Sequence, residues 1–244
     1  MIVSVASGKG GTGKTTVAVS LAIANGNAML IDSDVEEPNS NILLRSTMDR
    51  VEKVSVPIPK ILQDKCTFCG ECADFCAFNA LAVVKGLKVF HIKEICKSCG
   101  GCIRVCRYGA IVEEDNKIGE ISFSRKNDVD FVEGRLKIGQ ASVAPLIKRL
   151  MKNIPPDRDV IIDCPPGAAH AMKESVRPAD FLILVTEPTP FGYHDLKEAL
   201  VVADKLGKKT GIIINRSDIG DRKIHKLAGI WVSPYCLRYP LIQR

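Results

Sequence analysis

Nine residues near the start of the chain have the types and spacing of a phosphate-binding loop. The stretch is Gly8-Lys9-Gly10-Gly11-Thr12-Gly13-Lys14-Thr15-Thr16. Glycines let backbone N–H groups converge on an anion, and the start of the following helix adds unpaired N–H donors and a positive dipole. In this pattern Lys14 reaches the β- and γ-phosphates and the Thr15 hydroxyl is a ligand of Mg²⁺. The loop therefore predicts a nucleotide site.

Eight of the ten cysteines fall into two short runs with the same spacing, C-x₂-C-x₂-C-x₃-C. In two-cluster ferredoxins with this spacing, the fourth cysteine of each run ligates the other cluster. We therefore expect two [4Fe–4S] clusters. Cys66, Cys69, Cys72 and Cys106 would hold one, and Cys96, Cys99, Cys102 and Cys76 the second. Structural zinc is the alternative, although zinc modules usually pair C-x₂-C units across a longer gap.

The two runs depart from the bacterial ferredoxin pattern after their last cysteine, where a proline is expected. Ala77 stands there in one run and Arg107 in the other. Together with Lys97 and Arg104, Arg107 would raise the potential of the second cluster or guide an acidic electron donor. Solvated surface charge is the alternative for all three basic residues.

Three further polar positions follow short apolar runs that we expect to be strands. Asp32 ends the run 28–32 and Asp34 lies two residues beyond it. Asp163 ends the run 159–163, and Asn215 follows the run 210–214. Open α/β sheets bind ligands at the carboxyl ends of their strands, so these side chains should converge on the glycine-rich loop. Asp163 then suits a residue that holds Mg²⁺ through water beside Thr15.

Strands and helices alternate along most of the chain, which predicts a mostly parallel sheet covered on both faces. The first unit is a strand over 1–6, the loop and a helix over 14–25. Further helices are expected over 144–152 and 193–206, with strands over 118–124, 134–138 and 181–185. The predicted fold is an α/β P-loop NTPase with a small α+β ferredoxin-like insert.

The composition and periodicity of the sequence change near residue 55, where Pro57 and Pro59 should interrupt regular structure. We therefore divide the chain into a first ATPase part (1–55), a ferredoxin-like insert (56–114) and a second ATPase part (115–244). We expect the C-terminal segment Leu227–Arg244 to be atypical or truncated for such a fold, and Pro234 and Pro240 preclude a continuous amphipathic membrane helix across it.

Composition excludes several classes. With 244 residues, 46% hydrophobic, the chain can bury a full core, and no apolar run approaches the length of a membrane span. The formal charge of +6 is scattered, so we expect no nucleic-acid partner. Cysteine-rich runs in a chain that begins directly with a strand indicate metal rather than disulfides, and a cytoplasmic location.

The loop resembles the deviant Walker A motif of MinD/ParA-type P-loop ATPases, whose extra lysine corresponds to Lys9. The resemblance implies that two protomers sandwich ATP and that Lys9 reaches the partner's phosphates, like an arginine finger supplied in trans. It also implies that Asp34 positions the hydrolytic water, that Asp163 is the switch II aspartate and that Asn215 reads adenine. With both cysteine runs, the chain looks like a MinD-superfamily ATPase carrying an inserted ferredoxin domain.

The leading hypothesis is an ATP-binding, ATP-hydrolysing iron–sulfur protein, in which a nucleotide-driven homodimer gates electron transfer to a redox or iron–sulfur protein partner. Two alternatives remain open: an iron–sulfur assembly or carrier ATPase, and a positioning or scaffold ATPase with structural or sensing clusters. Cys164, next to Asp163, is expected to be a small buried residue; the rival role is ligation of a cluster shared between protomers.

Overall fold

The computed structural model describes residues 1–140, 142–218, 223–224, 226–227 and 236–238. Within them, one large sheet is built from β1 (Ile2–Ala6), β2 (Met29–Asp32), β3 (Arg50–Ile61), β6 (Ile111–Lys126), β7 (Val129–Leu136), β8 (Val160–Asp163), β9 (Phe181–Thr186), β10 (Lys209–Ile214) and β11 (Cys236–Arg238). Its helices are α1 (Lys14–Asn25), α2 (Ser40–Leu44), α5 (Ala144–Met151), α6 (His170–Val176) and α7 (Pro190–Lys205).

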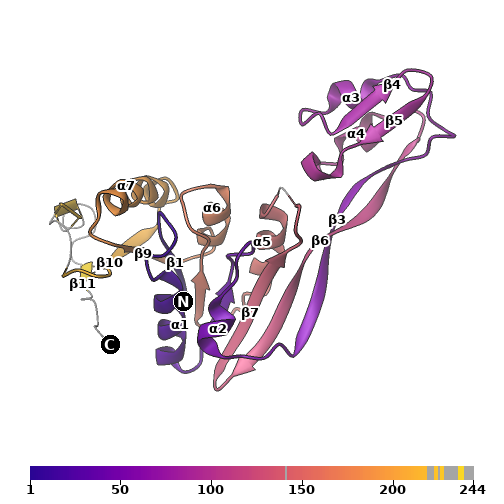
Figure 1. The fold of residues 1–244 in the computed structure, drawn as a ribbon. Coiled ribbons are helices and arrows are strands. Elements are labelled where there is room, and N and C mark those ends of the chain that lie inside the picture. The colour runs from indigo at the N-terminus through magenta and orange to yellow at the C-terminus, as the bar shows by residue number, and fades with distance from the viewer. Residues whose placement is uncertain (141, 219–222, 225, 228–235, 239–244) are drawn as a thin grey trace.

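The strand order is β11-β10-β9-β1-β8-β2-β7-β6-β3. Adjacent strands from β11 to β7 run parallel, whereas β6 is antiparallel to β7 and β3 is antiparallel to β6. The helices lie on both sides of the sheet (Figure 1). In β8 all four residues are buried and the first three are apolar, as expected of a strand with both faces covered. The predicted α/β fold with a mostly parallel sheet is confirmed.

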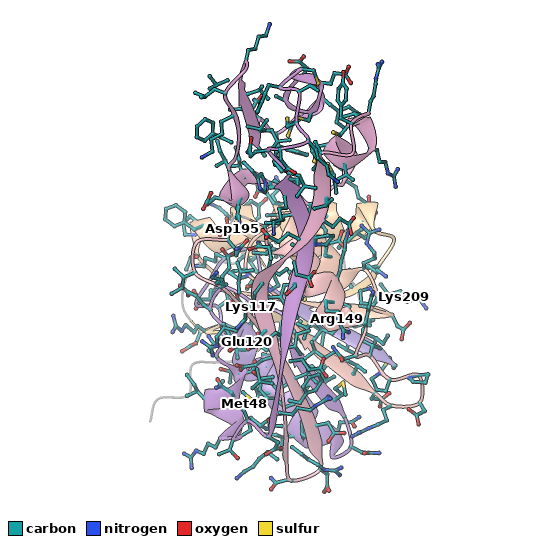
Figure 2. The ribbon with its side chains drawn as sticks, turned by 90° about the vertical axis from the view of Figure 1, so that its right-hand side faces the viewer. Met48, Lys117, Glu120, Arg149, Asp195 and Lys209 are labelled. Atoms are coloured by element: carbon teal, nitrogen blue, oxygen red, sulfur yellow. The ribbon has the colours of Figure 1, made fainter. Side chains whose placement is uncertain are left out.

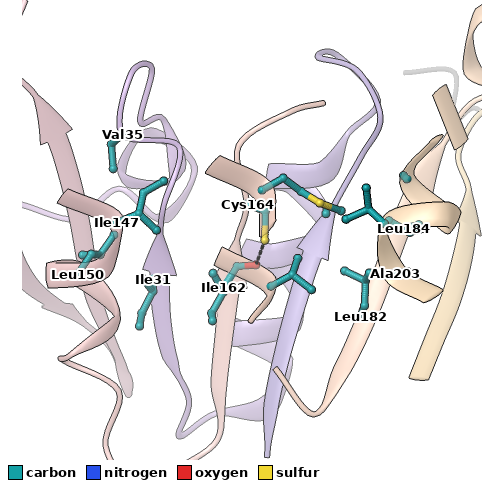
Figure 3. Close-up of a cluster of buried hydrophobic side chains, with 14 of the residues drawn as sticks. Ile31, Val35, Ile147, Leu150, Ile162, Cys164, Leu182, Leu184 and Ala203 are labelled. Atoms are coloured by element: carbon teal, nitrogen blue, oxygen red, sulfur yellow. Dashed lines mark hydrogen bonds between the residues drawn. The ribbon is translucent and has the colours of Figure 1, made fainter. Parts of the chain in front are cut away.

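Two hydrophobic cores pack against the two faces of the sheet. One contains α1 and α2 residues such as Ala18 and Leu44, and the other contains α5, α6 and α7 residues such as Leu146 and Met172. Cys164 lies in the second core, where its thiol donates to the Ile162 carbonyl oxygen at 3.8 Å (Figure 3). Burial raises the pKa of Cys164 to about 12, which disfavours the thiolate needed for metal ligation.

The prediction that Pro57 and Pro59 interrupt regular structure is wrong. Both lie within β3, paired with Asp115 and Glu113 of β6. Since β3 is the edge strand, a proline there removes an N–H that no further strand requires. The expected strand over 118–124 is part of the longer β6, and that over 134–138 begins earlier, as β7. The expected insert boundaries, 56 and 114, therefore fall inside continuous strands.

The cysteine-rich segment forms a small module at the far end of the ribbon made by β3 and β6 (Figure 1). It contains α3 (Glu71–Phe75), β4 (Leu81–Val84), β5 (Lys88–His91), the 3₁₀ helix η1 (Lys93–Ile95) and α4 (Gly101–Val105). Lys117 and Glu120 of β6, which pair at 3.2 Å, lie where β6 leaves β7 and continues toward the module, and both are labelled in Figure 2.

The module is an internal repeat in structure as well as in sequence. The N–H of Leu62 donates to the Ala110 carbonyl at 2.8 Å, and the equivalent N–H of Ile92 donates to the Ala80 carbonyl at 2.9 Å. The end of the β3–β6 ribbon thus corresponds to the β4–β5 hairpin in the other half. The β3–β6 ribbon is therefore part of the large sheet at one end and part of the module at the other.

Most of the segment expected to be atypical after Leu227 lies outside the described residues, but β11 pairs parallel with β10. The sheet therefore gains a strand there. Among the described helices, none has the length and apolar character to cross a membrane.

Candidate functional site

The glycine-rich loop connects β1 to α1 at the carboxyl edge of the sheet. Gly11 and Gly13 have φ of 78° and 90°, a region that favours glycine, so the loop can turn its backbone inward. A Cβ on Gly8 would overlap the backbone of Asp195 in α7. The backbone of α7 at Asp195 therefore packs closely against the loop, and only glycine fits at position 8.

Lys14, the predicted phosphate-binding lysine, is held by the predicted Mg²⁺ ligand. Its Nζ lies 2.6 Å from Asp163 Oδ1, and both side chains are buried. Ser40, at the start of α2, donates its hydroxyl to the other carboxylate oxygen, Asp163 Oδ2, at 3.1 Å. Burial would lower the pKa of Lys14, but the charge and hydrogen bond of Asp163 raise it above its usual value. Lys14 is therefore a cation in this site.

Asp32 and Asp34 have different roles in the loop after β2. Asp32 Oδ2 accepts the backbone N–H groups of Asn39 and Ser40 at 3.0 and 2.9 Å, which fixes the start of α2. Burial, followed by the charge of Asp163, raises the pKa of Asp32 to about 7. Burial likewise raises the pKa of Asp34 to about 6, with Lys14 opposing the shift. A carboxyl with this pKa is suited to exchange a proton near neutral pH.

Lys9 does not point freely into solvent. Its Nζ lies 3.4 Å from Oε2 of the buried Glu187, which follows β9. Arg216 Nη1 lies 3.0 Å from the other oxygen, Oε1. The signature lysine is thus held within its own protomer by a carboxylate that it shares with a second cation.

Asn215 lies against the phosphate loop, as expected of a residue at the end of β10. Its Nδ2 donates to the Thr12 carbonyl at 3.0 Å. A Cβ on Gly13 would come within 2.7 Å of the same amide nitrogen. The five strand-end positions Asp32, Asp34, Asp163, Glu187 and Asn215 therefore surround one loop.

The eight cysteines of the two runs surround two separate hollows in the module. Cys66, Cys69, Cys72 and Cys106 line the first, and Cys96, Cys99, Cys102 and Cys76 line the second. In each set the fourth cysteine comes from the other run. This is the division predicted from ferredoxin spacing, and four thiols around each hollow are the donor set that a [4Fe–4S] cluster requires.

The local backbone presents the thiols in the same way in both halves. Phe68 and Ser98 have φ of 58° and 53°, and the buried cysteines Cys72 and Cys102 are 8% and 9% exposed. Backbone N–H groups already donate to two of the sulfurs, from Phe68 to Cys66 and from Ala80 to Cys76, each at 3.4 Å. Such donors favour a negatively charged sulfur.

The nine cysteines whose side chains the structure describes are all free thiols. Across the described residues, no three cysteine, histidine or acidic side chains are placed to hold one metal ion. Burial raises the pKa of Cys102 to about 11 and also raises that of Cys72. Iron would therefore have to displace thiol protons when it binds.

Three residues at these sites were not predicted from the sequence. Ser40 follows Pro38 and Asn39 and touches Asp163, which lies 123 residues away. Glu187 directly follows the buried strand β9. Its position at the end of a strand, like that of Asp163, could have identified it. His91, five residues before Cys96, lines the second hollow.

The fold and the loop define an α/β P-loop nucleotide-binding protein. Residues 3–230 match the family model for the CobQ/CobB/MinD/ParA nucleotide binding domain, and the chain belongs to this family. The MinD/ParA resemblance of the loop is thereby confirmed at the level of the family.

The relatives that the chain matches include an uncharacterized protein of Methanocaldococcus jannaschii, 31% identical over 92% of this chain and 83% of the relative. Among solved structures, the MinD protein of Pyrococcus horikoshii complexed with Mg-ADP has a TM-score of 0.54 and 20% identity, covering 98% of this chain and 78% of that one. A variant of Cyanothece McdA in complex with ATP has a TM-score of 0.53 and 14% identity, covering 99% and 83%. At these identities the likeness shows the fold.

Proposed function

We propose that the chain is an ATP-binding and ATP-hydrolysing iron–sulfur protein, in which a nucleotide-driven homodimer gates electron transfer through two [4Fe–4S] clusters. The observation that carries the proposal is the division of eight cysteines between two hollows in crossed sets. Thiolates are soft, charged donors that suit iron–sulfur clusters. The module would act as a ferredoxin-like domain within residues 56–114, and its partner would be a redox protein.

At the nucleotide edge, Lys14 would bind the phosphates while Thr15 and Asp163 hold Mg²⁺, Asp163 through water. Asp34 would orient the attacking water and Asn215 would bind the adenine. The Mg-ADP and ATP bound in the two similar structures support this choice of ligand. Phosphate binding would compete with Asp163 for Lys14, which supports a change in the Asp163 segment when nucleotide enters.

A continuous path supports coupling between the nucleotide edge and the module. The N–H of Leu136, the last residue of β7, donates to the Val35 carbonyl at 2.7 Å, directly after Asp34. β7 pairs with β6, and β6 runs into the module at Ile111. A shift of the Asp34 segment would therefore move β7 and, through it, β6, the strand that connects the body to the module. Such coupling requires the two nucleotide states to bind the redox partner differently.

The proposal is tested by purifying the full chain without oxygen, measuring iron and acid-labile sulfide, and recording EPR spectra after dithionite reduction with ATP, ADP or no nucleotide. We expect about eight iron and eight sulfide per chain, as two [4Fe–4S] clusters require. The rate of electron transfer to a redox partner should differ between ATP and ADP.

Other outcomes would overturn the proposal. Zinc without sulfide would make the module structural. Rapid loss of iron to an acceptor apoprotein would make the chain a carrier. Hydrolysis that is stimulated by DNA, membrane or a protein partner but indifferent to cluster reduction would favour the scaffold class.

The role proposed for Lys9 gives a separate prediction. To reach the nucleotide of a partner protomer, Lys9 must leave Glu187 in its own protomer. Lys9→Ala should leave nucleotide affinity nearly unchanged and abolish ATP-dependent dimerisation and turnover, measured by light scattering and phosphate release. Lys14→Ala is the reference, because it should abolish nucleotide binding itself. Normal turnover by Lys9→Ala would make the loop an ordinary P-loop.

A further inference from the structure

The two hollows of the module differ at one position that the repeat makes equivalent. Ile61, at the end of β3, lies five residues before Cys66 and lines the first hollow. His91, at the end of β5, lies five residues before Cys96 and lines the second. An apolar side chain in one half is therefore replaced by a hydrogen-bonding ring in the other.

The His91 ring belongs to the inner face of β5. Side chains alternate along a strand, so His91 shares a face with Val89, which is 4% exposed and packs in the module core. Lys88 and Phe90, on the other face, are exposed. The His91 Nε2 atom is buried and has no hydrogen-bond partner among the described residues. A buried polar atom without a partner is unfavourable, and an acceptor in the hollow would relieve it.

The charged residues of the two halves differ in the same sense. The second run carries Lys97, Arg104 and Arg107, where the first has Thr67, Asp74 and Ala77. Lys97 and Arg104 line the second hollow, whereas Arg107 lies 3.4 Å from Glu71. Positive charge and N–H donors both stabilise the extra negative charge of a reduced cluster.

The second hollow is also the one beside the body of the molecule. A small cavity is lined by Lys93, Cys96 and Lys97 of the module and by Gln140, Ser142 and Pro145 near the start of α5. An electron that rests at the second hollow therefore lies next to the part of the chain that continues from β7.

We propose that His91 Nε2–H donates a hydrogen bond to a sulfur at the hollow formed by Cys96, Cys99, Cys102 and Cys76, and thereby makes that cluster the more easily reduced of the two. The inference rests on the proposed function, because it requires both clusters. The step is the transfer of one electron from a low-potential donor, dithionite in the experiment. No bond is made or broken, and the proton stays on Nε2. Electrons that enter through the first cluster then collect at the second, next to the body.

The test is an EPR-monitored potentiometric titration of the full chain, loaded anaerobically, at fixed pH. We expect two different midpoint potentials in the wild type. His91→Ile, which copies the first half of the repeat, should shift the higher potential to a more negative value and leave the lower one in place. Ile61→His is the reciprocal variant and should shift the lower potential upward. His91→Gln keeps a side-chain N–H donor and should retain most of the wild-type separation.

Failure of the inference is distinct from failure of the proposed function. A wild-type chain that takes up no iron and sulfide refutes both. Clusters with equal potentials, or a higher potential unmoved by His91→Ile at wild-type iron content, refute the role of His91 alone. Should His91→Ile lose iron, Ile61→His decides, and a lower potential that stays at its wild-type value in that variant overturns the inference.

Discussion

Asp163 connects the charged groups of the nucleotide edge. It forms an ion pair with Lys14 and accepts a hydrogen bond from the Ser40 hydroxyl. Its negative charge also adds to the effect of burial, which raises the pKa of Asp32 to about 7. One buried lysine therefore faces more carboxyl groups than it can neutralise. Mg²⁺ supplies the missing positive charge when it binds such a group. Under the proposed function, this excess of carboxyl groups is the arrangement that a bound Mg²⁺ would stabilise.

Asp34 gives a pH-dependent prediction for the metal-free and nucleotide-free chain. Burial raises its pKa to about 6, Lys14 opposes this, and the charges of Asp163 and Glu37 add to it. The unfolded value is about 3.9, so the folded state binds the proton more tightly. The stability that this group contributes is full at low pH and falls as pH rises through about 6. Asp34→Asn cannot ionise and should gain stability relative to the wild type as pH rises from about 4 to about 6, with the difference constant above that.

Urea unfolding of the two proteins across this pH range measures the difference in free energy of unfolding. Glu36→Gln, which neutralises an exposed neighbour, is the matched control and should show a much smaller change. A difference between wild type and Asp34→Asn that stays constant with pH would show that the carboxyl is not held in its neutral form by burial.

At the scale of single residues, contiguous motifs and polar residues at strand ends were predictable, whereas isolated side chains without a pattern were not. The phosphate loop and the cysteine runs are encoded by contiguous spacing, so Lys14 and Cys96 could be assigned from the sequence. Lys14 and Asp163 are 149 residues apart in the sequence. Ser40, which donates a hydrogen bond to Asp163, belongs to no recognisable sequence motif. The ion pair that holds Lys9 depends on Glu187, which only the strand order of the sheet brings beside the loop.

The β3–β6 ribbon shows why an element was missed. Pro57 and Pro59 are two residues apart, so their nitrogens point to the same side of β3, away from β6. On the side of β3 that pairs with no further described strand, the absent N–H groups remove the donors that another chain would use for pairing. What looked like a strand breaker in the sequence is thus compatible with a strand that must stay unpaired on one side.

Restoring these donors should therefore promote self-association. The double variant Pro57→Val/Pro59→Val should form concentration-dependent oligomers through the ribbon edge, measured by sedimentation velocity without nucleotide. Ser55→Val adds an apolar side chain to the same strand without adding an N–H and should stay as the wild type. A double variant that sediments like the wild type at all concentrations would show that the edge is protected by other means.

At the scale of the molecule, the module and the body share strands but not a core. The module has its own hydrophobic cluster around Leu81, Val89 and Ile111, separate from the two clusters of the body. Ile61 and Ile111 face each other in register at the junction. The body should therefore fold without the module when these two residues are joined by a short turn.

An excision variant tests this separation. Residues 62–110 are replaced by Asn-Gly, which forms the tight turn that two paired antiparallel strands require. The variant should bind nucleotide with nearly wild-type affinity and contain no iron, measured by fluorescent-nucleotide titration and metal analysis. The reverse result, a soluble variant that has lost nucleotide binding, would make the module part of the nucleotide site.

The part of β6 that continues beyond β7, paired there with β3, has a mechanical consequence. From Gly119, the last residue paired with β7, to Ile111 the strand extends for about 27 Å at roughly 3.4 Å per residue. A rotation of about 10° at its base would swing the tip by roughly 5 Å over this length. The ribbon is thus a lever arm whose pivot lies where Leu136 is tied to Val35. Under the proposed function, a small movement at the phosphate loop would become a much larger one at the cysteines, enough to move the clusters away from a redox partner.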